Sequence, residues 1–197
     1  MYGRDNKYLR IAKRINEQYG YSVVVSANPV EYDCDLELEI NYISDELGAY
    51  DEMYFIDISN GAIIGARQGF GINGIQKMLL INGLLMINYH KTIKGIKAFG
   101  AKPIDVVYGE NDPSAMYTVW LENEKISNCD VRIIPGADHN FSGMEDVFED
   151  IIVRWGGKLS ILKSKGVISV KRMFLILFLL GPIQAIIISG LSILFRH

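Results

Sequence analysis

The chain has 197 residues, of which 49% are hydrophobic and 22% charged, and its formal net charge is −3. This length suits one globular domain with a sizeable core, and the lack of a basic stripe argues against a nucleic-acid partner. Two cysteines and three histidines are too few for a disulfide framework or a multi-histidine metal centre, so no metal or other cofactor is expected. The first residues, MYGRDNKYLR, are too polar for a secretory signal.

The first part of the chain alternates helical and strand patterns. Residues 5–19 carry apolar side chains at helical spacing, and Gly20 follows as a typical helix cap. A β-branched run, Ser22–Asn28, predicts a buried parallel strand, and residues 35–49 predict a second helix. The second strand is expected at Met53–Ile58, directly before a helix of small residues.

The alternation continues after residue 70. The patterns predict a third strand at Lys77–Leu85, a helix at His90–Phe99, a fourth strand at Ile104–Gly109, a helix over 114–126, a fifth strand at Val131–Gly136 and an amphipathic helix at Glu145–Trp155. Strands that alternate with helices in this way favour an α/β fold, with a mostly parallel sheet and helices on both faces.

The C-terminal segment is the most hydrophobic part of the chain. Residues 173–195 read MFLILFLLGPIQAIIISGLSILF and carry no charge. About 20 apolar residues suffice to cross a bilayer as a helix, so this segment predicts a C-terminal hydrophobic helix that spans a membrane. Two alternatives are a buried core helix and a segment that folds back onto the body to cover an exposed sheet edge.

Basic residues surround the predicted span unevenly. Six precede it and one follows it: Arg154, Lys158, Lys163, Lys165, Lys171 and Arg172 against Arg196. Positive residues near a span stay on the cytoplasmic side. We therefore expect a body that faces the cytoplasm, a basic tether over 158–172, and an anchor in the cytoplasmic membrane over 173–195.

Three polar residues follow three of the predicted strands. Ser59 comes after the second strand, Asp112 after the fourth and His139 after the fifth. Ligands bind at the carboxyl ends of strands in open α/β sheets, so these side chains are expected close together. A hydroxyl needs a neighbouring imidazole to take its proton, and the imidazole needs a carboxylate to orient it. The three residues are therefore candidates for a nucleophile, a base and an acid.

Each of these residues also has a purely structural interpretation. Ser59, followed by Asn-Gly, is typical of a helix cap or a turn. Asp112 precedes Pro113 and is typical of an N-cap, and His139 beside Asp138 is consistent with a surface pair. The order Ser, Asp, His, with each residue after a predicted strand, favours the catalytic interpretation.

The sequence resembles the α/β-hydrolase family, specifically its small bacterial members without a cap domain. The resemblance covers residues 3–155, within a domain predicted over 1–157, and it is carried by YLRIAKRINEQYGYSVVVSANP, ISNGA, VYGENDPS and IIPGADHNFSG. It implies that Ser59 is the nucleophile, Asp112 the acid member and His139 the base. It also implies that the backbone N–H groups of Asn60 and Gly3 stabilise the oxyanion.

Two features depart from the family pattern. Asp57 stands two residues before the serine, where the family has glycine, and adds both bulk and a carboxylate. The chain also begins at Met1, where a preceding strand and its His-Gly loop are expected to end. That strand normally lies between the strands seen here at Ser22–Asn28 and Met53–Ile58, so the chain is expected to be an N-terminally truncated hydrolase core without its first strands.

Two functions follow from these observations. The first is a serine hydrolase that acts on a small acyl ester or related small-molecule acyl substrate through an acyl-enzyme, with an open pocket. The second is a catalytically impaired hydrolase-fold module, attached to the membrane, that acts in binding or structure. The sequence does not indicate an oligomeric state.

Overall fold

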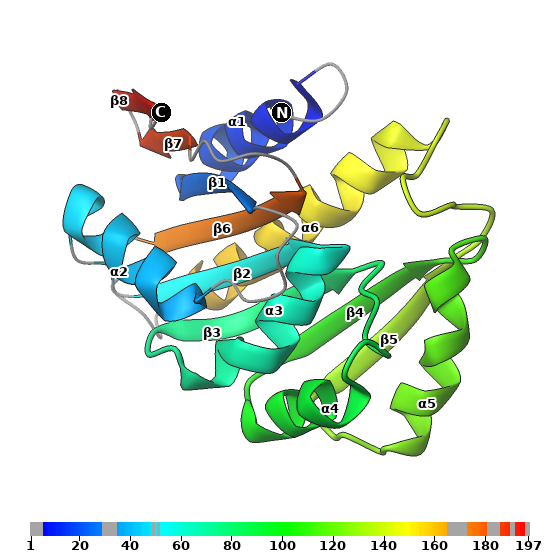
Figure 1. The fold of residues 1–197 in the computed structure, drawn as a ribbon. Coiled ribbons are helices and arrows are strands. Elements are labelled where there is room, and N and C mark those ends of the chain that lie inside the picture. The colour runs from blue at the N-terminus through cyan, green and yellow to red at the C-terminus, as the bar shows by residue number, and fades with distance from the viewer. Residues whose placement is uncertain are drawn as a thin grey trace.

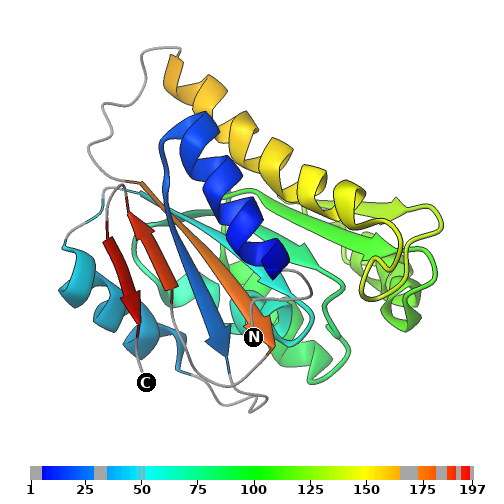
Figure 2. The same ribbon diagram turned by 90° about the horizontal axis from the view of Figure 1, so that it is seen from above.

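A computed structural model of the protein describes residues 6–28, 35–48, 50, 52–164, 173–180, 186–189 and 192–195. These residues form an eight-stranded sheet in the order β5-β4-β3-β2-β6-β1-β7-β8 (Figures 1 and 2). Neighbouring strands from β5 to β1 are parallel, and β7 and β8 continue the sheet in antiparallel pairs. The strands are β1 (Ser22–Asn28), β2 (Glu52–Ile58), β3 (Ile75–Ile81), β4 (Ile104–Gly109), β5 (Cys129–Ile134), β6 (Met173–Leu180), β7 (Ile186–Ser189) and β8 (Ser192–Phe195).

Helices cover both faces of this sheet, as the alternating sequence predicts. They are α1 (Lys7–Tyr19), α2 (Leu36–Leu47), α3 (Asn60–Gln68), α4 (Tyr89–Ala98), α5 (Thr118–Asn123) and α6 (Glu145–Ser164), with short 3-10 turns η2 (Gly69–Gly71) and η3 (Pro113–Tyr117). Helices α1 and α6 lie on one face, and α2, α3 and α4 lie on the other (Figure 2). The predicted α/β class is confirmed.

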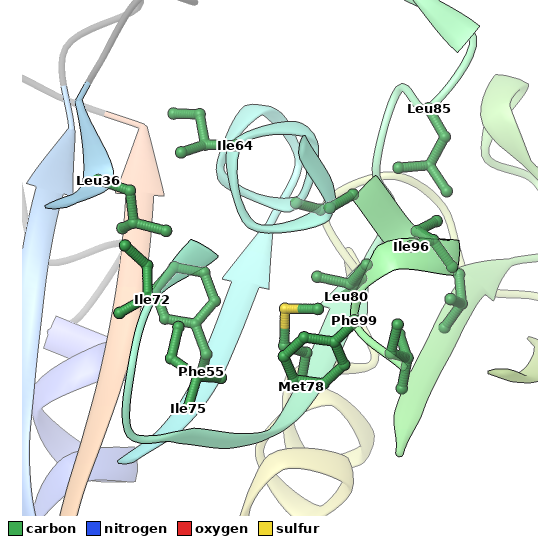
Figure 3. Close-up of a cluster of buried hydrophobic side chains, with 14 of the residues drawn as sticks. Leu36, Phe55, Ile64, Ile72, Ile75, Met78, Leu80, Leu85, Ile96 and Phe99 are labelled. Carbon is green, nitrogen blue, oxygen red and sulfur yellow. The ribbon is translucent and has the colours of Figure 1, made fainter. Parts of the chain in front are cut away.

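Each face of the sheet has its own hydrophobic core. One core joins β2, β3 and β4 to α2, α3 and α4, and its centre contains Phe55, Met78 and Leu80 (Figure 3). The other joins the opposite face of the same strands to α1 and α6 and contains Ile56 and Trp155. Successive residues of β2 therefore alternate between two buried surfaces, which explains why its sequence is almost continuously apolar.

Element boundaries differ from the predictions where local backbone geometry ends an element. Strand β3 ends at Ile81 rather than Leu85, because Asn82 has a left-handed backbone with φ +49°. The helix predicted over 114–126 is divided into η3 and α5.

Helix α6 continues to Ser164, through the first half of the predicted tether. Its two glycines lie against Tyr19 of α1, where a Cβ on Gly157 would lie 2.5 Å from the tyrosine oxygen. Gly157 therefore serves a close helix approach rather than a helix end, whereas a Cβ on Gly156 would make ordinary contacts.

The predicted membrane-spanning helix is not present in the described part of residues 173–195, which consists of the strands β6, β7 and β8. Among the described residues, no helix is both long and apolar enough to span a bilayer. The physical reason is that a strand buried on both faces is also a continuous apolar run, which hydrophobicity alone does not distinguish from a helix. Strand β6 takes the position between β1 and β2 at which the sequence predicted a missing strand.

Candidate active site

Ser59 occupies the sharp turn between β2 and α3. Its backbone has φ 57° and ψ −115°, a conformation that side-chain-bearing residues rarely adopt. The turn is held to the neighbouring strand, because the Ser59 N–H donates to the carbonyl oxygen of Ile81 at 2.8 Å. The Ser59 side chain makes no capping hydrogen bond to α3. Ser59 is therefore the N-cap of α3 by position only, and its hydroxyl is available for another partner.

That partner is His139. The Ser59 Oγ lies 3.0 Å from the Nε2 atom of His139, and the other ring nitrogen, Nδ1, is hydrogen-bonded to the Oδ2 atom of Asp112. The Asp112 side chain is completely buried, whereas the His139 side chain is 33% exposed. The other Asp112 oxygen, Oδ1, accepts the backbone N–H of Ser114 at 2.5 Å, so this residue is both a helix cap and the partner of the histidine. The structure thus brings together the three side chains that the sequence singled out.

The loops that carry Asp112 and His139 are bound to each other. Asn111 donates its backbone N–H to the carbonyl oxygen of Ala137 at 2.8 Å, and Glu110 accepts the Gly136 N–H at 2.8 Å. At Gly109 the two loops come so close that a Cβ would lie 2.5 Å from the Ala137 oxygen. The spacing between the acid and the histidine is therefore fixed by backbone contacts.

Asp138 shapes the histidine loop from within. Its Oδ1 atom accepts the backbone N–H groups of Asn140 at 2.9 Å and Ser142 at 2.8 Å. These backbone hydrogen bonds, with that of Ser142 the largest contribution, lower the pKa of Asp138 below its ordinary value. Asp138 is thus a turn-forming carboxylate next to His139.

Asn82 is a site residue that the sequence analysis did not single out. Its side chain is fully buried at the end of β3. The Nδ2 atom donates to the carbonyl oxygen of His139 at 2.8 Å, and the Oδ1 atom accepts the N–H of Gly109 at 2.8 Å. One amide therefore joins three strand ends. An Asn-Gly pair directly after an apolar strand was the available signal, but it is also the signal of an ordinary turn.

Comparison with solved structures supports this description of the fold. Est1E from Butyrivibrio proteoclasticus, with ferulic acid bound, superimposes with a TM-score of 0.53 at 13% identity, over 78% of this chain and 82% of that one. A protein of unknown function from Agrobacterium tumefaciens, assigned to the alpha/beta hydrolases, gives a TM-score of 0.50 at 16% identity, over 66% and 60% of the two chains. The chain has the α/β-hydrolase fold.

Matches with a lower TM-score carry no further argument about the fold. An alpha-beta serine hydrolase homologue from Coxiella burnetii matches at 18% identity with a TM-score of 0.48, over 61% of this chain and 56% of that chain. The chain therefore spans little more than half the length of some hydrolase-fold structures that it matches. No protein-family model and no curated protein sequence matches the chain.

Asp57 is the main departure from the hydrolase pattern. Its side chain is fully buried, and within the described part of the chain neither carboxyl oxygen makes a hydrogen bond of normal geometry. The extra bulk is accommodated by Gly65 on α3, where a Cβ would lie 2.0 Å from the Asp57 Oδ2 atom. Burial raises the pKa of Asp57 well above its ordinary value, and the Gly65 backbone N–H opposes this shift. The environment thus favours the neutral carboxylic acid.

Of the two predicted oxyanion donors, the structure describes only Asn60. Asn60 is the first residue of α3, so its N–H belongs to the first turn, whose donors have no acceptor within the helix. Gly3 lies outside the described residues. In the described ranges, no group of three or more His, Cys, Asp or Glu side chains is arranged to hold a metal ion.

Proposed function

We propose that the protein is a serine hydrolase that cleaves small acyl esters, or related acyl substrates, through an acyl-enzyme. The observation that carries the proposal is the continuous hydrogen-bonded series from Ser59 through His139 to the buried Asp112. Each member has the position that its role requires, because the serine is on a strained turn, the histidine is between the two others, and the carboxylate is shielded from water.

The geometry supports a specific division of roles. With its Nδ1 proton donated to Asp112, neutral His139 presents the lone pair of Nε2 to the Ser59 hydroxyl. As the Ser59 oxygen attacks the acyl carbon, the hydroxyl proton passes to His139, and Asp112 stabilises the imidazolium that forms. His139 then returns the proton to the leaving alcohol. In the second half of the reaction the same histidine takes a proton from water as the water oxygen attacks the acyl carbon. The bond between that carbon and the Ser59 oxygen then breaks, and His139 returns the proton to Ser59.

We propose that the N–H of Asn60 and the positive end of α3 stabilise the oxyanion, with Gly3 as the second donor. The substrate is proposed to be small and reached directly from solvent. Between Ser59 and Asp112 the chain contains only α3, η2, β3, α4 and β4, which leaves no inserted lid. Ferulic acid, the ligand of Est1E in one matching structure, makes an aromatic acyl ester a reasonable test substrate beside a simple acetate.

A fluorophosphonate probe tests the proposal. The probe should attach to Ser59 in the folded protein, and Ser59→Ala should abolish attachment. His139→Gln should slow attachment by at least about 100-fold, because the general base contributes factors of that size. Ser44→Ala serves as the control, since the Ser44 hydroxyl donates to the Ile40 carbonyl oxygen within α2 and has no part in the series. Folded wild-type protein that never reacts at Ser59 would refute the proposed hydrolase activity.

The second candidate is a hydrolase-fold module with impaired catalysis, and Asp57 is the observation that favours it. A fully buried carboxyl group two residues before Ser59, to which the described part of the chain offers no hydrogen bond of normal geometry, is an unusual neighbour for a developing oxyanion. Asp57→Gly distinguishes the candidates. Esterase activity that is present only in this variant indicates a disabled scaffold, whereas comparable activity in both proteins supports the working hydrolase.

Attachment to a membrane remains a separate proposal. A spanning helix over 173–195 requires β6 to leave the sheet, so one molecule cannot have both arrangements at once. Extraction of cell membranes at alkaline pH without detergent tests this. Protein that is released by the extraction contradicts the anchor, and protein that stays with the lipid supports it.

A further inference from the structure

Strand β6 fills an interior position of the sheet from the far end of the chain. It lies between β1 and β2 and runs parallel to both (Figure 1). Its register with β1 extends from Ser22 opposite Phe174 to Asn28 opposite Leu180. Its register with β2 extends from Glu52 opposite Met173 to Asp57 opposite Phe178. No other strand of the described chain pairs with β2 on that side.

The position cannot be closed by moving β1 against β2. With β6 removed, the two strands would stand about two strand spacings apart, roughly 9.5 Å, which is too far for hydrogen bonds. Packing outside β6 maintains this separation. Tyr21, just before β1, stacks on Tyr54 of β2 with ring centroids 6.3 Å apart, and Arg10 of α1 binds Glu149 of α6 at 2.6 Å.

Strand β6 also lies beside the proposed nucleophile. Strand β2 leads directly into Ser59, and on the β3 side the turn is held by the hydrogen bond to Ile81. On the other side, the β2 ladder is provided by β6, which continues two residues beyond the pair of Asp57 and Phe178. Helix α3, which begins with the proposed oxyanion donor, contacts β2, β3 and β6 together.

We infer that β6 acts as a C-terminal donor strand that completes the sheet and positions Ser59 for its contact with His139. Its paired backbone satisfies the inward edges of β1 and β2, and unmet backbone groups at a sheet interior are costly. The part of this inference that concerns reactivity rests on the proposed function, whereas the part that concerns the order of β2 does not.

Two proline variants of the full-length chain test the inference. Leu177→Pro removes a donor from the middle of β6, opposite Val25 and Ile56, and proline is poorly tolerated in an interior strand. Leu194→Pro makes the same change in β8, which pairs only with β7 in the described sheet. The first readout is the rate at which a fluorophosphonate modifies Ser59. The second is hydrogen exchange at the amides of β2, with those of β4 as internal reference.

Leu177→Pro should slow the modification of Ser59 by at least about tenfold and speed exchange in β2 by a similar factor, since buried ladder bonds are lost. Exchange in β4 should change much less, and Leu194→Pro should leave both readouts within about twofold of the wild type. Unchanged β2 exchange in Leu177→Pro overturns the inference. Equal effects of the two prolines overturn it as well, because the damage would not be specific to β6.

A nicked form covers the case in which Leu177→Pro fails to fold. A protease site inserted within residues 165–172 allows the folded full-length protein to be cut between α6 and β6. The C-terminal piece should remain with the body in gel filtration. In mild denaturant it should dissociate, and the β2 amides should lose their protection from hydrogen exchange in the same transition. A piece that separates at once while β2 stays protected overturns the inference. If wild-type Ser59 never reacts, the proposed hydrolase fails, and the exchange data still decide the role of β6.

Discussion

Replacement of Asn82 by glycine should weaken both the fold and the site, because one buried amide joins β3 to the loops of Gly109 and His139. Glycine suits this test, since the backbone of Asn82 has φ +49°, which glycine adopts without strain. The substitution therefore removes the side-chain hydrogen bonds without adding a backbone clash. No other change to the turn is required.

The size of the effect follows from the two groups that lose their partner. The N–H of Gly109 and the carbonyl group of His139 each lose a hydrogen bond of 2.8 Å. A buried polar group without its partner costs about 1–3 kcal/mol. The bond to the His139 carbonyl group is partly buried, so water can replace it in part, whereas the bond from Gly109 is buried and carries most of the cost. We expect the free energy of unfolding to fall by about 2–4 kcal/mol.

Urea unfolding followed by tryptophan fluorescence measures this change, and the fluorophosphonate rate measures the site. The rate should fall by about tenfold or more, because a displacement of His139 that raises the activation free energy by about 1.4 kcal/mol already has that effect. Asn88→Gly is the matched control, since Asn88 also has positive φ, at 63°, but makes no side-chain cap hydrogen bond. A loss for Asn82→Gly below about 1 kcal/mol, or one equal to the control, would refute the reasoning.

Three further predictions concern Asp57, Gly109 and Glu149. Because the folded-state pKa of Asp57 lies above its ordinary value of 3.8, this residue makes the fold less stable as pH rises from that value. Asp57→Asn should therefore gain stability relative to the wild type between acid and neutral pH. If the free energies of unfolding of the two proteins change in parallel with pH, the prediction is contradicted. Gly109→Ala should destabilise the protein by about 1–3 kcal/mol in thermal unfolding and slow Ser59 labelling, whereas Gly156→Ala, where a Cβ has ordinary contacts, should be neutral or stabilising. Glu149→Gln should cost about 1 kcal/mol in low salt and less in high salt, because the side chains of its partners Arg10 and Arg14 stay 45% and 36% exposed. A loss that salt does not reduce would contradict the ion pairs.

The identity of the candidate site residues was available from the sequence. Ser59, Asp112 and His139 each follow an apolar run, and parallel strands present their carboxyl ends at one edge of a sheet. That local order was sufficient to predict that the three side chains meet. The strands Ser22–Asn28 and Ile104–Gly109 were predicted with the boundaries that the structure has, because β-branched runs between turn residues have few alternatives.

The environment of these residues was not available from the sequence, because it depends on contacts between distant segments. Asp57 lies two residues before Ser59 in sequence, but its effect depends on Gly65, which provides the space for its carboxyl group. Asn82 has the sequence context of a turn, and only the tertiary structure gives its amide the partners Gly109 and His139.

The C-terminal segment shows the same division most clearly. Composition determined that residues 173–180 must be shielded from water, since they carry no polar side chain. It did not determine whether lipid or protein provides the shield, because a spanning helix and an interior parallel strand are equally apolar. Only the tertiary structure shows the protein position that residues 173–180 can take, because the facing edges of β1 and β2 offer the backbone hydrogen bonds that a strand between them needs.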